Sequence, residues 1–180
     1  GINEEGVETP LSAIGQINML APTAAPLNCY LDNIAKDAVK VNWTDNNNNE
    51  QGYSIEKSID EINYKEVGRT GPDETGYTGI GVKGLKINNE YWYRVRAFGE
   101  VGYSPYAVAK ARWTLAAEPA GKGFSKITTT MIRANWDKSG NPDYTSYYFE
   151  NLTTRTNSGW ITGESWANRN LKEETEYRLR

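Results

Sequence analysis

The chain has 180 residues, 24% of them charged, and a net charge of −3, and this length allows one or two domains. It contains no histidine, so the commonest general base and metal ligand is missing, and no basic stripe alternates with aromatic residues, so nucleic acid is not an expected partner. No apolar run approaches the length of a membrane span, so membrane insertion is not expected.

Two short stretches rich in proline and alanine divide the chain. They are LAPTAAP at residues 20–26 and LAAEPA at residues 115–120, and both predict extended, fairly stiff connectors. We therefore expect a segment over residues 1–22, a domain over 23–115 and a second domain over 116–180. The one cysteine, Cys29, can form no intramolecular disulfide, and we expect it to be a small core residue.

The sequence after the first connector is repeated after the second. Pro119 follows Pro26 by 93 positions, and at nearly the same offset DAVKVNWTD is matched by TTMIRANWD. In both stretches alternate residues are apolar up to Trp43 and Trp136, which predicts a strand with one buried face. The offset of 93 also relates four further apolar pairs: Leu31 and Phe124, Ile34 and Ile127, Val39 and Ile132, Val41 and Ala134. A repeat of this length is typical of immunoglobulin-like sandwiches.

Short strands and polar turns alternate between residues 45 and 84, as in an antiparallel sandwich. The polar run DNNNNEQG starts the series, and its oxygen ligands between Asp45 and Glu50 raise the possibility of a calcium site. Their spacing matches no EF-hand loop, so a solvated loop is the favoured interpretation.

A longer strand is predicted over residues 91–97, where every second side chain is apolar or aromatic. Leu85 stands six positions before Tyr91, and Leu171 stands six positions before Tyr177. A tyrosine at the start of such a strand can hydrogen-bond back to the preceding turn, which predicts a tyrosine corner at Tyr91 and at Tyr177.

These motifs resemble the fibronectin type III domain of the kind common in bacterial surface proteins. The resemblance rests on NWTDNNNNEQGYSIEKS and LKINNEYWYRVRAFGEVGYSPYA in residues 24–115, and on NWDKSGNPDYTSYYFENLTTRTNSGWITGESW and LKEETEYRLR in the second repeat, which has a shorter middle. It implies an all-β chain of tandem sandwiches in an extracellular or cell-surface protein. Because this fold serves mostly as spacer and binding scaffold, we expect no catalysis and no cofactor.

When both repeats are aligned as sandwiches of this family, one end of the chain lacks a strand and the other end has an extra one. The second repeat reaches Arg180 without an equivalent of SPYAVAKARWTL, whereas Thr9-Pro10-Leu11 resembles Ser104-Pro105-Tyr106. We therefore expect residues 1–22 to be a last strand that completes the second repeat of another copy, head to tail. The expected inter-copy strand residues are Leu11, Ala13, Ile14 and Ile17. The expected acceptor core residues are Ile132, Ala134, Trp136, Phe149 and Leu179.

Two architectures explain this complementarity, and an accidental boundary is a third explanation. The 180 residues are either a window of a longer tandem array or a subunit that donates its first strand to a neighbour, as in donor-strand pili. The turn residues at 3–6 favour the array, since a hairpin turn is useful only between strands of one chain. In both cases the expected function is a structural repeat or subunit of an extracellular fibre, filament or large surface protein.

The alternative is a spacer or carbohydrate-binding module of a secreted enzyme or adhesin. Its sugar-stacking surface would come from the tyrosines and tryptophans of the second repeat. We expect Tyr147, Phe149 and Trp166 to be core residues instead. Exposure is expected for Trp92, Tyr148 and Trp160, which could pack between domains.

Two glycosylation sequons complete the candidates, Asn42-Trp43-Thr44 and Asn151-Leu152-Thr153. Alternation in the first strand turns Asn42 away from the core, and Asn151 follows a strand. Both asparagines are expected to be accessible, although unmodified asparagine is favoured for a bacterial protein.

Overall fold

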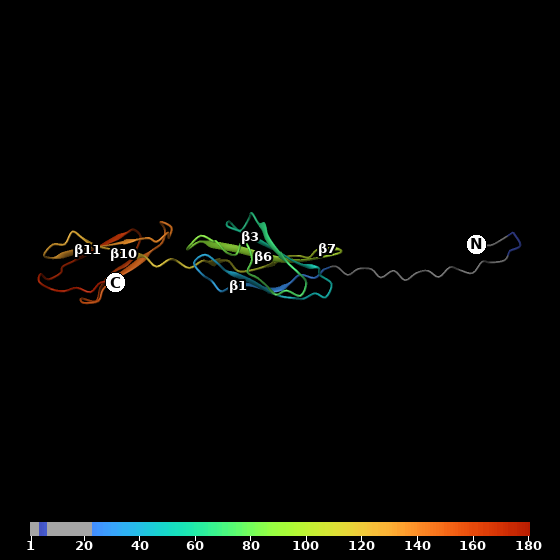
Figure 1. Cartoon of the computed structure of the whole chain (residues 1–180), viewed down its shortest axis with the longest axis horizontal. Coiled ribbons are helices and arrows are strands. Elements are labelled where there is room, and N and C mark those ends of the chain that lie inside the picture. The colour runs from blue at the N-terminus through green and yellow to red at the C-terminus, as the bar shows by residue number, and fades with distance from the viewer. Residues whose placement is uncertain (1–3, 7–22) are drawn as a thin grey trace.

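The computed structural model describes residues 4–6 and 23–180, and residues 23–180 form two all-β sandwiches lying end to end (Figure 1). The inter-copy strand residues expected in the first segment, Leu11, Ala13, Ile14 and Ile17, lie outside the described residues. Residues 4–6 form an exposed turn in which Gly6 has a φ of 78°. No helix long and apolar enough to span a membrane occurs in the described parts of the chain.

The first sandwich has two antiparallel sheets. One has the order β1-β2-β5 and contains β1 (Leu27–Asp32), β2 (Lys40–Thr44) and β5 (Gly76–Tyr77). The other has the order β4-β3-β6-β7 and contains β4 (Lys65–Thr70), β3 (Gly52–Ser58), β6 (Glu90–Gly99) and β7 (Gly102–Tyr103). Two short strands, β8 (Ala107–Val108) and β9 (Arg112–Trp113), also pair with β6.

The alternating pattern of the sequence is realised in the core of the first sandwich. On β6, Tyr93 and Val95 are fully buried, and Trp43 of β2 packs against Tyr53 of β3 with ring centroids 5.1 Å apart. Cys29 packs against the same core, and burial raises the pKa of its thiol to about 12. The cysteine therefore sits where a small apolar residue is needed, and it is an unreactive thiol at neutral pH.

The second sandwich has a three-stranded sheet like β1-β2-β5, but its other sheet has fewer strands than the β4-β3-β6-β7 sheet. Its first sheet has the order β10-β11-β14, with β10 (Ala120–Ser125), β11 (Met131–Asp137) and β14 (Ser165–Arg169). Its other sheet pairs β12 (Tyr147–Asn151) with β13 (Thr156–Ile161). Equivalent apolar residues are buried differently, since Leu31 of the first sandwich is 5% exposed and Phe124 of the second is 56% exposed.

The same pair of asparagine hydrogen bonds occurs where the chain enters each sandwich. The Asn47 side chain accepts from the Ala24 amide at 2.8 Å and donates to the Ala24 carbonyl at 2.6 Å. Asn141 makes the same pair of bonds to Ala117, at 2.8 and 2.7 Å. A single amide thus satisfies both backbone groups of a connector residue, which holds the connector against the loop after β2 or β11.

The two sandwiches also contact each other directly. The Tyr144 hydroxyl donates to the Asn88 carbonyl at 2.7 Å, and the Asn88 side chain donates to the Thr145 hydroxyl at 2.9 Å. The Trp113 and Tyr144 rings meet edge to face with centroids 6.0 Å apart. The connection is therefore a packed joint with polar and aromatic contacts.

We predict that Trp43→Ala lowers the free energy of unfolding of the first sandwich by about 3–5 kcal/mol, because it empties a closed core. Trp136 is 4% exposed, close to the 3% of Trp43, but one side of its surroundings is open, so Trp136→Ala should cost less. Chemical denaturation followed by circular dichroism measures both. An unchanged midpoint for Trp43→Ala would contradict the assignment of Trp43 to the core.

Candidate functional site

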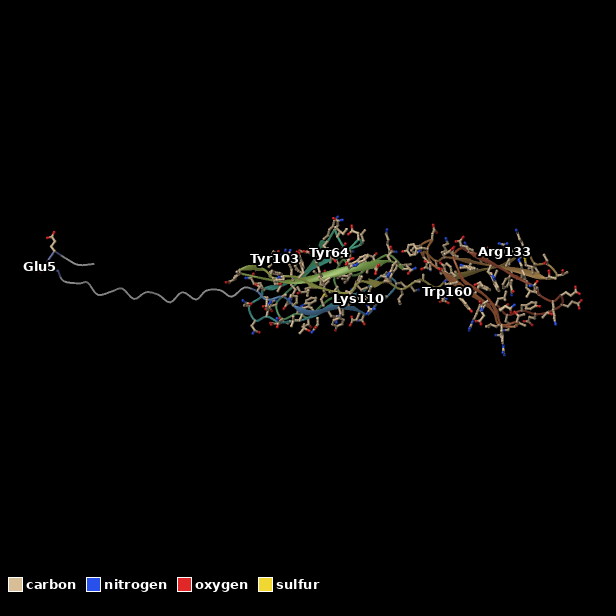
Figure 2. All side chains as sticks on the ribbon, turned by 180° about the vertical axis from the view of Figure 1, so that it is seen from behind. Glu5, Tyr64, Tyr103, Lys110, Arg133 and Trp160 are labelled. Carbon is tan, nitrogen blue, oxygen red and sulfur yellow. The ribbon has the colours of Figure 1, made fainter. Side chains whose placement is uncertain are left out.

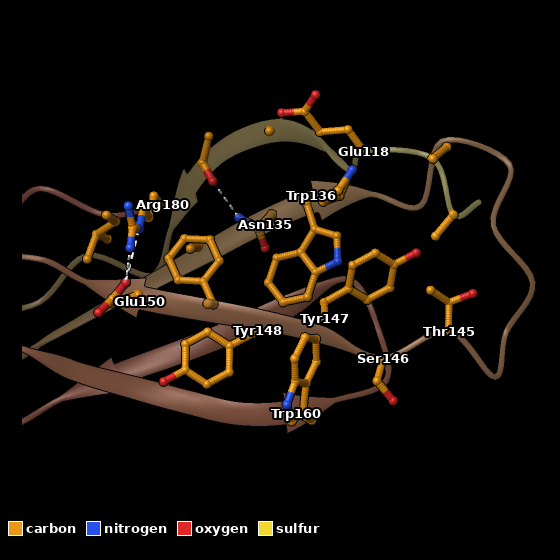
Figure 3. A pocket seen from close by; sticks show the side chains of 18 of the residues that line it. Glu118, Asn135, Trp136, Thr145, Ser146, Tyr147, Tyr148, Glu150, Trp160 and Arg180 are labelled. Atoms are coloured by element: carbon orange, nitrogen blue, oxygen red, sulfur yellow. Dashed lines mark hydrogen bonds and ion pairs between the residues drawn. The ribbon is translucent and has the colours of Figure 1, made fainter. Parts of the chain in front are cut away.

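An apolar groove of about 760 Å³ opens in the second sandwich, between β10 and β11 on one side and β12 on the other (Figure 3). Its lining includes several large apolar and aromatic side chains, among them Trp136, Tyr147, Tyr148, Phe149, Trp160 and Leu179. The corresponding space in the first sandwich is filled by the buried side chains of β6. The groove is thus the uncovered half of a sandwich core.

The floor of the groove is an ordered aromatic cluster. The Trp136 and Phe149 rings stack with centroids 5.6 Å apart and an angle of 18° between their planes, and Trp136 lies 5.8 Å from Tyr147. Phe149 also contacts Trp166, with centroids 5.6 Å apart. Each ring is held by its neighbours, so the floor is shaped before anything covers it.

Strand pairing in the first sandwich shows what closes this space. There, β3 pairs with β6 along its whole length, from Gly52 opposite Phe98 to Ser58 opposite Trp92. This pairing brings the inward side chains of β6 beside Tyr53, which is fully buried.

In the second sandwich the matching edge of β12 is paired only at one end. Glu150 and Arg180 exchange both backbone hydrogen bonds, at 2.8 and 2.9 Å, and the Leu152 amide donates to the Arg178 carbonyl at 2.8 Å. From Phe149 back to Tyr147, none of the described residues forms a strand beside this edge. An unpaired strand edge next to apolar surface is a template for a further strand.

The groove brings together most of the residues that the sequence predicted as an acceptor core. Ala134, Trp136, Phe149 and Leu179 all line it. Ile132 lies one step further along the same face of β11, in a separate depression of about 480 Å³ shared with Leu171. The strand period placed these side chains on one face, but the sequence could not show where the groove ends.

Part of the groove's lining is an exposed aromatic pair. Trp160 is 74% exposed (Figure 2). Its ring centroid is 5.5 Å from that of Tyr148, the residue opposite it on β12 (Figure 3). Both were expected to be exposed, whereas Trp92 is half-buried. The pair therefore adds exposed aromatic surface to the groove on the side of β13.

The tyrosine hydroxyls fold back onto the turns before their strands. The Lys86 amide donates to the Tyr91 hydroxyl at 2.8 Å, and the Lys172 amide donates to the Tyr177 hydroxyl at 2.6 Å. Tyr91 is buried, whereas Tyr177 is half-buried. The two corners are therefore alike in hydrogen bonding and unlike in the packing around them.

The sequons are not accessible in the folded chain, which corrects the expectation from alternation. Asn42 is only 5% exposed because it lies in the central strand of its sheet, opposite Gly76. Asn151 is fully buried, and its side-chain oxygen accepts the Thr153 and Thr154 amides. Asn151 thus shapes the turn between β12 and β13, and the nitrogen that would carry a glycan is enclosed.

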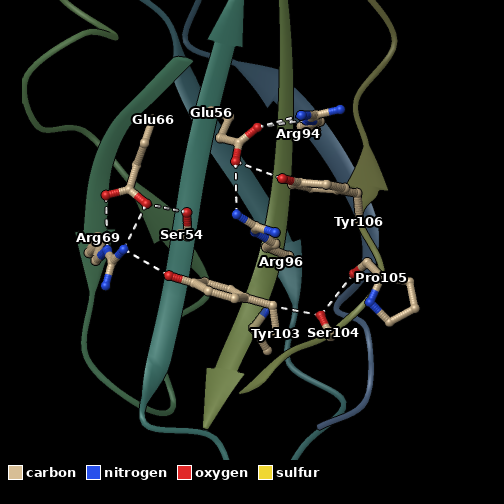
Figure 4. Close-up of polar contacts among 11 residues, drawn as sticks. Ser54, Glu56, Glu66, Arg69, Arg94, Arg96, Tyr103, Ser104, Pro105 and Tyr106 are labelled. Carbon is tan, nitrogen blue, oxygen red and sulfur yellow. Dashed lines mark hydrogen bonds and ion pairs between the residues drawn. The ribbon is translucent and has the colours of Figure 1, made fainter. Parts of the chain in front are cut away.

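A charged network on the outer face of the first sandwich was not predicted (Figure 4). The Glu56 carboxylate accepts from Arg94 at 2.6 Å, from Arg96 at 3.3 Å and from the Tyr106 hydroxyl at 2.7 Å. Arg94 lies over the Tyr106 ring and Arg96 over the Tyr103 ring, at 3.8 and 3.9 Å. Because Glu56 is buried and fully partnered, we interpret the network as a brace across β3 and β6.

Comparison with known proteins agrees with this architecture. The fold resembles a two-domain fibronectin type III segment of chicken tenascin, with a TM-score of 0.61, 16% identity, and 86% of this chain and 88% of that chain covered. Protein sidekick-2 of Gallus gallus is 28% identical over 124 residues, which cover 64% of this chain and 6% of that protein. No protein-family model matches the chain.

The chain is therefore a tandem of fibronectin type III-like sandwiches. It spans only a small fraction of the length of its chicken relative. Both of these similar proteins are from chicken, so a bacterial origin stays a prediction.

We predict that the two tyrosine corners contribute differently to the free energy of unfolding. Tyr91→Phe removes the hydroxyl of a buried tyrosine and leaves the Lys86 amide without its acceptor in a partly buried site, so it should lower the free energy of unfolding by about 1–3 kcal/mol. Tyr177→Phe breaks the same kind of bond where water replaces the hydroxyl, so its cost should be under about 1 kcal/mol. Thermal denaturation of the two variants makes the comparison, and a larger loss for Tyr177→Phe would contradict it.

Proposed function

We propose that this chain is a non-catalytic structural repeat or subunit of an extracellular fibre, filament or large cell-surface protein. Successive copies are joined head to tail, and residues 1–22 of one copy complete the second sandwich of the next. Sandwiches of this kind are common in cell-surface proteins, where they act as spacers and binding scaffolds. The observation that carries the proposal is the groove beside the unpaired edge of β12.

The groove has the chemistry of a strand acceptor. Its floor is apolar, with Trp136 and Phe149 stacked, and the backbone of β12 between Tyr147 and Glu150 provides an edge for main-chain hydrogen bonds. Addition of a strand to a sheet edge takes affinity from main-chain bonds and specificity from pockets for alternate side chains. The groove supplies both.

The proposed occupant resembles the segment that follows β6 in the first sandwich and pairs with it. There, Ser104 locks the last strand to β6, because its amide donates to the Ala97 carbonyl and its hydroxyl accepts the Ala97 amide, both at 2.9 Å. Thr9-Pro10 places a hydroxyl and a proline in the same order as Ser104-Pro105. The apolar side chains for the groove would come from Leu11, Ala13, Ile14 and Ile17.

The turn before this segment also fits the proposal. Residues 4–6 form a turn, and Gly6 adopts a positive φ that favours glycine. Such a turn joins consecutive strands of one chain, which favours a continuous array over separate subunits. The mass of the intact natural chain distinguishes the two, since separate subunits would have a mass near 20.2 kDa.

The test measures self-association of the 180-residue chain by light scattering over a range of concentrations. We expect head-to-tail association in the unmodified chain, because an exposed core and a free strand edge both favour pairing. A double variant, Leu11→Asp with Ile14→Asp, should stay monomeric. The matched control, Ile59→Asp with Ile62→Asp, makes the same changes at side chains 72% and 81% exposed and should associate like the unmodified chain.

A permuted chain provides the complementary result. When residues 1–20 are moved to follow Arg180, the strand can close its own sandwich, and we expect a monomer with two cooperative unfolding transitions. A concentration-independent monomer for the unmodified chain would overturn the proposal. Association that the Leu11 and Ile14 changes leave intact would overturn it as well.

A further inference from the structure

Three carboxylates from two loops converge at the end of the first sandwich where the chain enters it. Asp45 and Glu50 lie in the loop between β2 and β3, and Asp73 lies in the loop between β4 and β5. One oxygen from each lies within 4.8 Å of the others. The sequence showed only the first two, because Asp73 reaches them through the folding of the sandwich.

Glu50 is the residue that distinguishes this cluster from a solvated group of acids. It is 8% exposed, and one of its oxygens accepts the Asp73 amide at 3.0 Å. Its other oxygen, Oε2, is buried and has no hydrogen-bond partner. A buried carboxylate oxygen without a partner is costly, and in native proteins it calls for a missing ion or water.

Protein cations do not neutralise the cluster. None of the ion pairs formed within residues 4–6 and 23–180 involves Asp45, Glu50 or Asp73. The electrostatic potential around the cluster is negative at the neighbouring Tyr53. Burial, the hydrogen bond to Asp45 and the charge of Glu50 all raise the pKa of the Tyr53 phenol. The site therefore concentrates negative charge without supplying positive charge.

The loops that carry the ligands are held in place from both sides. The Asp45 side chain accepts the Asn47 amide at 2.8 Å and the Tyr53 hydroxyl at 2.5 Å, and Asn47 in turn clamps Ala24. The backbone of Asp73 is tied to Glu50. The carboxylates thus face one another in a framework that exists before any ion binds, which reduces the cost of ordering ligands.

We propose that Asp45, Glu50 and Asp73 form a binding site for a divalent cation, with Ca²⁺ preferred over Mg²⁺. The ligands are all oxygens, which suits both ions, but they come from two irregular loops, and Asp73 is exposed so that water can complete the shell. Ca²⁺ accepts six to eight oxygens in flexible geometry, whereas Mg²⁺ requires a near-ideal octahedron.

The site is separate from the groove, which lies in the other sandwich, so the inference does not depend on the proposed function. A bound ion would join the β2–β3 loop to the β4–β5 loop. Through Asn47 it would also brace the connector at Ala24. We therefore expect Ca²⁺ to stabilise the first sandwich against unfolding.

The experiment titrates the chelator-treated 180-residue chain with Ca²⁺ by calorimetry and follows thermal unfolding of the same samples. We expect a dissociation constant of about 10⁻⁴–10⁻³ M, the range of extracellular calcium modules, and a melting temperature that rises with Ca²⁺. Glu50→Gln and Asp73→Asn should each abolish the rise. Glu74→Gln removes a neighbouring exposed charge outside the cluster and should retain it.

Two further measurements make the result decisive. Tb³⁺ in place of Ca²⁺ should luminesce when Tyr53 is excited, because its hydroxyl bonds to a ligand residue, and Glu50→Gln should remove that signal. The same rise in melting temperature should need a concentration of magnesium chloride at least about tenfold higher than that of Ca²⁺. No binding and no shift at about 10 mM Ca²⁺, well above the expected dissociation constant, would overturn the site. The site would also be overturned if Ca²⁺ raised the melting temperature equally in the unmodified chain and in the Glu50→Gln and Asp73→Asn variants.

Discussion

The architecture depends on one constraint: the strand that carries the core of each sandwich must be paired on both edges. In the first sandwich β3 meets this constraint, because β4 and β6 flank it and Tyr53 and Ile55 are fully buried. In the second, β12 has β13 on one edge and a short contact with Arg178–Arg180 on the other. The open groove beside β12 follows from that difference.

The sequence predicted the fold because its signals are local and repeated. Alternating apolar residues and an offset of 93 identify β2 and β11, and they place Trp43 and Trp136 in equivalent buried positions. Strand period depends only on which face of a sheet meets water, so it can be recognised without the partner strand. The same signals placed Phe149 and Leu179 on the surface that the groove now exposes.

Features that need two distant segments were not predicted. In the run of asparagines after Asp45, only the fold shows that Asn47 is the one that clamps a connector. Asp73 joins the carboxylate cluster from another loop, and no spacing rule links it to Asp45. Such contacts depend on how loops close over one end of a sandwich, and composition carries little information about that.

The sequons show a different limit. Alternation correctly turned Asn42 away from the core, yet the outer face of a central strand can be covered by its neighbours. Direction relative to the core and access to solvent are separate properties. A sequence pattern reports the first, and only the packing of adjacent strands decides the second.

The hydrogen bonds from Asn47 to Ala24 and from Asn141 to Ala117, here called the asparagine clamps, affect the orientation in which the chain enters each sandwich. At the joint, Ala117 is held by Asn141 while Tyr144 and Thr145 contact Asn88 of the preceding sandwich. A connector fixed on both sides transmits the orientation of one sandwich to the next, whereas a free linker would average it.

The start of the first sandwich carries the same clamp but a different neighbour. Where the second sandwich has the aromatic Tyr144 near its clamp, the first has the buried carboxylate Glu50, three positions after Asn47. Tyr144 stiffens its joint by hydrogen bonding and ring packing. A cation held by Glu50, Asp45 and Asp73 would stiffen the other end of the first sandwich by joining its two loops, so the rigidity of that end would depend on Ca²⁺ concentration.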